Sequence, residues 1–164
     1  MKNDLRVTYP LWMMCFILLI AASIYLIGTT AVIEGHGTDE VTFIFSIESN
    51  LISFSILFVL LIGSLITFFI KLAKHNRQYP HKKFSLFYLK PPEYLEDDEL
   101  FQQATGLATK KVYTFFASAI PILAVLYLVL PIGKMWMVIG VFLLGFMQYL
   151  IYYLEIRKYV AEEE

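Results

Sequence analysis

Four long stretches of apolar residues dominate this sequence, and each is long enough to cross a lipid bilayer. They cover residues 11–31, 51–70, 112–130 and 135–154, and none contains Asp, Glu, Lys or Arg. A helix needs about 20 apolar residues to cross a hydrocarbon core of roughly 30 Å. Lipid cannot hydrogen-bond an open strand, so uncharged stretches of this length predict helices. We therefore predict an all-α integral membrane protein with four transmembrane helices.

The overall composition agrees with this class. The chain is 59% hydrophobic and 16% charged, whereas an average soluble domain is nearer half apolar and a quarter charged. The charged residues lie almost entirely between the four stretches. This pattern excludes a disordered chain, a disulfide scaffold and a free basic nucleic-acid binder, and it argues against a soluble enzyme. We expect residues 1–164 to form a single membrane domain.

The Lys and Arg residues are distributed unevenly, which predicts an orientation. Two lie in the N-terminal tail, eight in segment 71–111 and two in the C-terminal tail, while the loop between the last two stretches holds only Lys134. The loop at 32–50 has none and carries four acidic residues. Because basic residues concentrate in cytoplasmic connections, we predict a multi-pass protein of the plasma (inner) membrane. Both termini and segment 71–111 would be cytoplasmic.

The first stretch has a competing interpretation as a cleaved signal peptide. Thr29, Thr30 and Ala31 could supply a small-residue cleavage site. However, 21 uncharged residues exceed the usual apolar region of such a peptide, about 7 to 15 residues. This length favours a retained membrane anchor, and cleavage would leave the later topology unchanged.

A short connection predicts how the helices pair. Only Pro131, Ile132, Gly133 and Lys134 separate the third stretch from the fourth. So short a turn makes the two helices antiparallel neighbours. With the first two stretches joined by the 32–50 loop, we expect two antiparallel hairpins.

Segment 71–111 sorts its charges along the chain. Its first half carries six basic residues and no acidic one between positions 71 and 90. Aromatic rings lie among these cations, as expected of a strip on anionic lipid headgroups. The same cations could instead be only the signal that stops translocation after the second helix, and nothing else in the chain resembles a nucleic-acid-binding module. The candidate contact residues for lipid or a partner are Lys82, Lys83, Phe84, Phe87 and Lys90.

An acidic cluster follows, and it predicts the start of another helix. Five acidic residues lie between positions 93 and 99, where carboxylates can cap a helix and oppose its dipole. The apolar residues Leu100, Ala104, Leu107 and Ala108 should share one face at helical spacing, so we expect an amphipathic helix that leads into the third span. It could dock a partner or pack against the basic strip of its own chain. The candidate contact residues are Asp97, Asp98, Leu100, Ala104 and Leu107.

Residues that would carry chemistry are missing from the pattern. The single cysteine, Cys15, excludes an internal disulfide or a thiol pair. The spans lack the membrane-embedded carboxylate of coupled carriers, so the chain is similar to small four-helix multidrug exporters in span number only. Glu155 stands at the end of the fourth span, as a gate residue or as an ordinary interfacial residue. We expect no catalytic residue, no cofactor and no metal site.

These observations indicate a protein that acts by contact with proteins or lipids. An accessory, regulatory, assembly or immunity-type role fits, with the anionic inner leaflet and a protein partner or a second copy as the expected contacts. We do not expect an enzyme or a nucleic-acid binder. The alternative is a subunit of a homo-oligomeric transporter or channel, in which Ser, Thr and Gln side chains would line a pathway between subunits.

Overall fold

The computed structural model describes residues 5–35, 41–45, 50–78 and 99–162. Its elements follow in the order α1 (Leu5–Thr30), β1 (Ala31–Gly35), β2 (Val41–Phe45), α2 (Leu51–Gln78), α3 (Glu99–Val129) and α4 (Lys134–Glu162). Each helix is long and apolar enough to span a membrane. The prediction of an all-α membrane fold with four spanning helices is confirmed.

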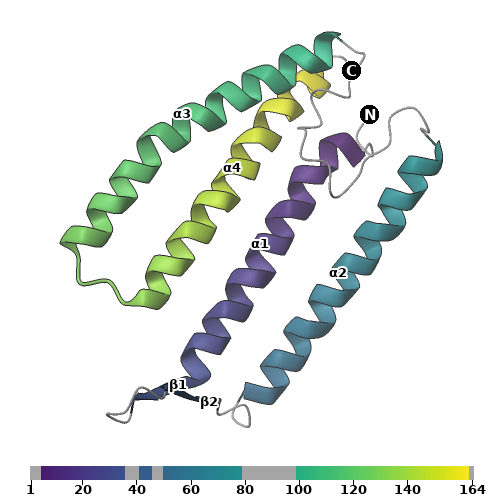
Figure 1. Ribbon diagram of the computed structural model, residues 1–164. Coiled ribbons are helices and arrows are strands. Elements are labelled where there is room, and N and C mark those ends of the chain that lie inside the picture. Colours follow the sequence, from purple (N-terminus) through teal and green to yellow (C-terminus); the bar gives the residue numbers. More distant parts are fainter. Residues whose placement is uncertain (1–4, 36–40, 46–49, 79–98, 163–164) are drawn as a thin grey trace.

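The four helices form a row in the order α3, α4, α1, α2 (Figure 1). Neighbouring helices in this row run antiparallel, so the α1–α2 and α3–α4 hairpins lie side by side through α1 and α4. The most extensive helix contacts are between α1 and α4, followed by α3 with α4 and α1 with α2. As a result α2 and α3 are the outer helices of the row.

The loop between α1 and α2 contains a small antiparallel sheet that the sequence interpretation did not foresee. Strands β1 and β2 pair in a register that sets Ala31 opposite Phe45 and Gly35 opposite Val41. Both strands are rich in β-branched and aromatic residues, which favour extended backbone. The hairpin lies at the end of the row opposite the two chain termini (Figure 1).

The helices extend well beyond the uncharged stretches from which they were predicted. The first begins at Leu5 rather than at position 11, and α2 continues to Gln78 rather than ending at position 70. α3 already begins at Glu99, so the expected amphipathic helix and the third span are one continuous helix. α4 continues to Glu162. All four extensions lie at the end of the row where the chain termini are (Figure 1).

This end, which we call the packed end, also holds the buried core. None of the residues in the most apolar 18-residue windows of α3 and α4 is buried. Along these windows lipid chains can surround apolar side chains, so burial by protein is not needed. At the packed end the helices do cover one another. The most buried residues there are Leu5, Val7, Pro10 and Met14 of α1, Phe68, Leu72 and His75 of α2, Ala104, Thr105 and Ala108 of α3, and Ile156 of α4.

Close contacts lock α4 to both neighbours at the opposite end. Tyr127 of α3 donates its hydroxyl to the backbone carbonyl of Met137, at 2.7 Å. A side chain at Gly140 would collide with that same hydroxyl, and one at Gly28 of α1 would collide with the flexible end of Met135 of α4. Glycine thus leaves room for a neighbouring side chain at both positions, and a larger residue would force the Tyr127 ring or the end of Met135 to move.

The Gly140 contact gives a prediction with a matched control. Gly140→Ala should displace the Tyr127 ring and break its bond to Met137, a loss of about 1 kcal/mol. Gly145→Ala should be neutral or stabilising, since its new methyl would meet Ile17 at an ordinary 3.5 Å and alanine favours the helix. Thermal unfolding in mild detergent measures both, and equal melting temperatures would contradict this packing.

A second prediction concerns the packed end. Ala108 is fully buried and Ala117, on the same helix, is exposed. Ala108→Leu should overpack the contact with Val7 and Ile156 and destabilise the protein by about 1–3 kcal/mol. Ala117→Leu should leave the melting temperature in detergent nearly unchanged. If both variants lost the same stability, the packed end would not be the core of the molecule.

Candidate contact site

The structure describes only part of the contact region that the sequence predicts. Leu100 lies in α3, but its side chain is not among those described, while Ala104 and Leu107 are fully described. Ala104 and Leu107 are thus the predicted contact residues whose side chains the structure describes. The other predicted contact residues lie outside the described residues: Lys82, Lys83, Phe84, Phe87, Lys90, Asp97 and Asp98.

The prediction that Ala104 and Leu107 share one face of α3 is wrong, because the two residues lie on different sides of the helix. Ala104 is 1% exposed, whereas Leu107 is 42% exposed. The inward stripe consists of Phe101, Ala104, Thr105 and Ala108, and at about 100° per residue Leu107 lies well to one side of it. One side of the first part of α3 thus packs against the rest of the chain. The side that carries Leu107, which we call the open side, is exposed.

The inward stripe packs against α1 and α4. Val7, Ala108 and Ile156 form the centre of this cluster, and Phe101, Tyr152 and Tyr153 pack around it. The contact uses small α3 residues, so the backbones of α3 and α4 can approach closely. It holds the start of α3 on the rest of the molecule, and the open side of this helix is therefore presented on a fixed support.

Thr105 was not recognised from the sequence as part of this stripe. It is 1% exposed, and its hydroxyl donates to the backbone carbonyls of Phe101 and Gln102 at 2.9 and 3.0 Å. Because the hydroxyl is satisfied within its own helix, the side chain can be buried without an unpaired polar group. The signal in the sequence is the helical spacing of Thr105, four residues after Phe101 and three before Ala108.

An ion pair ties α3 to α4 beside this cluster. The Nζ atom of Lys111 lies 2.6 Å from Oε1 of Glu155, and that of Lys158 lies 3.4 Å from Oε2. The Glu155 side chain is 12% exposed, against 52% for Lys111. Charge-assisted bonds of this length are the stronger kind. The geometry makes Glu155 a link between two helices.

An aromatic cluster joins α1 to α2 at the same end. Leu5, Phe68 and Leu72 form its centre. The Phe68 ring meets the edge of Phe16 at 5.5 Å and lies 5.8 Å from Trp12, in the tilted arrangements that aromatic rings prefer. The Lys71 ammonium lies over the Trp12 ring, 5.1 Å from its centroid, as a cation–π contact.

The described part of this region consists of packed helical side chains and surface cations. No group of three His, Cys, Asp or Glu residues that could hold a metal ion occurs in the parts of the chain that the structure describes. Cys15 is a free, exposed thiol. What the described residues build is an ordered helical surface beside a set of exposed cations.

Comparison with known proteins adds no assignment. No family model, no curated protein and no solved structure matches the chain. A function for the chain is therefore inferred from the geometry of the packed end.

The link through Glu155 can be tested by a double-mutant cycle. Glu155→Gln and Lys111→Gln should each lower stability, and the double variant should lose less than the two single losses together. The coupling should be about 0.5–1 kcal/mol because Lys111 is half exposed. Thermal unfolding in detergent measures the cycle. Strictly additive losses would mean that the two residues do not stabilise each other.

Proposed function

We propose that this chain is a small multi-pass protein of the plasma membrane that works by contact with another protein or with lipid. An accessory, regulatory, assembly or immunity-type role, without catalysis of its own, fits such a protein. The observation that carries this proposal is the open side of the start of α3, held in place by Val7 and Ile156.

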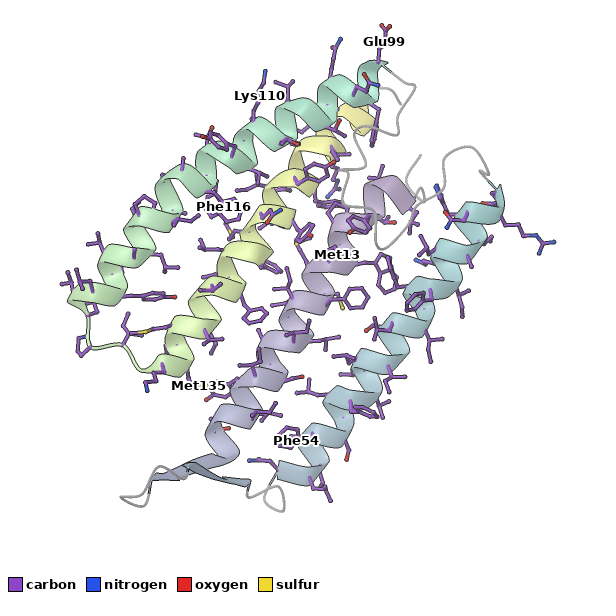
Figure 2. All side chains as sticks on the ribbon, in the orientation of Figure 1. Met13, Phe54, Glu99, Lys110, Phe116 and Met135 are labelled. Carbon is purple, nitrogen blue, oxygen red and sulfur yellow. The ribbon has the colours of Figure 1, made fainter. Side chains whose placement is uncertain are left out.

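The open side has the composition of a contact surface. Leu107 is exposed together with Gln103 and Lys110, at spacings of three and four residues along α3. An apolar side chain flanked by polar ones on a supported helix is suited to partner binding, because little ordering is needed when the partner arrives. Figure 2 shows Lys110 on the part of α3 that lies away from α4.

The proposed orientation places the packed end in the cytoplasm. Twelve of the 13 Lys and Arg residues belong to the tails and to segment 71–111. The described helix ends from these regions all lie at the packed end (Figure 1). The positive-inside rule then puts this end on the cytoplasmic side, where a cytoplasmic partner would reach α3.

Site-specific photo-cross-linking in native membranes tests the contact role. A benzophenone amino acid at position 107 should give a discrete protein adduct. The same amino acid at position 128, where Leu128 is 87% exposed near the far end of α3, is the matched control and should give none. Adducts would be identified by mass spectrometry. The absence of a protein adduct at 107, or equal adducts at both positions, would contradict a partner surface at the packed end.

The alternative, a subunit of a homo-oligomeric transporter or channel, is favoured by the exposure of the outer helices. Ile52 and Phe58 of α2 are 76% and 64% exposed, and Val129 of α3 is 69% exposed. A second copy could cover these faces as well as lipid does. In the photo-cross-linking experiment this alternative predicts adducts of twice the chain's mass at position 128. A stable monomer in mild detergent, together with no flux after reconstitution, would exclude it.

A further inference from the structure

The described basic side chains are divided between those that have a partner within the chain and those that face outward. Lys111 and Lys158 contact Glu155, and Lys71 lies over Trp12. Lys74 and Arg77 of α2, Lys110 of α3 and Arg157 of α4 are exposed, and none of these four forms an ion pair with another residue that the structure describes. Three helices therefore each present a cation at the packed end.

On each of these helices one cation, Lys74, Lys110 or Arg157, has an exposed apolar side chain about one helical turn farther into the spanning part of the helix. Ile70, 63% exposed, precedes Lys74 by four residues, and Leu154, 47% exposed, precedes Arg157 by three. Tyr113, 75% exposed, follows Lys110 by three residues on α3, which runs in the opposite direction. Residues three and four apart are neighbours on a helix surface, so each cation and its apolar partner form one continuous patch.

We propose that these three patches are contact sites for acidic phospholipids. A phospholipid carries an anionic phosphate at the headgroup level and acyl chains directly beneath it, and each patch has a cation above an apolar side chain in the same order. A soluble phosphate would use the cation alone, and an acidic peptide would not match an apolar half that faces the hydrocarbon. This inference deepens the contact function proposed above, and it rests on the packed end lying at a membrane surface.

The opposite end of the row gives the contrast. Lys134, at the start of α4, is the basic residue that the structure describes there, and it is exposed. The structure thus predicts an asymmetric protein, with acidic lipids gathered around the leaflet at the packed end. Lys134 also provides the matched control, because its removal changes the charge by the same amount per residue at the other surface.

The test uses the purified full chain in phosphatidylcholine bilayers with trace spin-labelled lipid. Electron paramagnetic resonance measures the association of labelled phosphatidylglycerol relative to labelled phosphatidylcholine. A cation at the headgroup level should raise the association of labelled phosphatidylglycerol about fivefold above that of labelled phosphatidylcholine. The triple variant Lys74→Gln, Lys110→Gln, Arg157→Gln should lower this preference, whereas Lys134→Gln should leave it unchanged.

Three further arms keep the result decisive. Each single Gln variant should remove part of the preference, which covers the case in which the triple variant does not fold. Ile70→Ala with Tyr113→Ala should weaken association while every charge remains. Inorganic phosphate at millimolar concentration should not compete, and full competition would assign the cations to a soluble anion.

The inference is overturned if the natural chain shows no preference, or if the triple variant and Lys134→Gln behave alike. Because the assay contains no other protein, its failure is separate from a failure to find a partner at position 107.

Discussion

Lipid can surround apolar side chains along most of this molecule, so the protein does not need to bury them there. The protein forms a core of its own toward the end where the helices leave the lipid. Over the apolar windows of α3 and α4 no residue is buried by protein. Where α3 and α4 continue past these windows, water would meet the apolar side chains, and there the two helices pack together with α1. In α2 the buried Phe68 still belongs to the uncharged stretch, close to its end. The core therefore lies toward one end of the row rather than in its middle, around Phe68, Ala108 and Ile156.

The same constraint explains how the packed end is built. Its contacts join each helix to the next in the row: the aromatic cluster around Phe68 joins α2 to α1, and the cluster around Ala108 joins α1, α3 and α4. The Lys111–Glu155 pair adds a polar link between α3 and α4. Such contacts fix the start of α3 and leave Leu107 and Lys110 facing outward. In our proposal, this supported surface and the neighbouring cations make the contacts through which the protein acts.

The sequence predicts the number of helices, their class and their two hairpins because charge-free stretches of 19 to 21 residues have one common explanation in lipid. It does not predict where the helices end, because hydropathy reports contact with lipid and not helical backbone; residues 71–78 continue α2 although most of them are polar. The position of α1 beside α4 depends on shape, as in the approach of Gly28 to Met135, which no periodicity reveals. The sequence identifies Ala104 as an apolar residue of a helix. The positions of α1 and α4 are needed to show which residues share its inward side.

In our account the first residues of α3, 99–109, stand outside the hydrocarbon core, while the rest of this helix lies within it. Power-saturation paramagnetic resonance on the protein in bilayers tests this most directly, with spin labels placed one at a time at positions 103, 107, 117 and 125 of α3 in a Cys15→Ser background. We predict that a water-soluble relaxation agent reaches labels at 103 and 107, whereas oxygen, which concentrates in lipid, dominates at 117 and 125. Oxygen-dominated relaxation at 103 and 107 would place the packed end inside the bilayer and contradict the account.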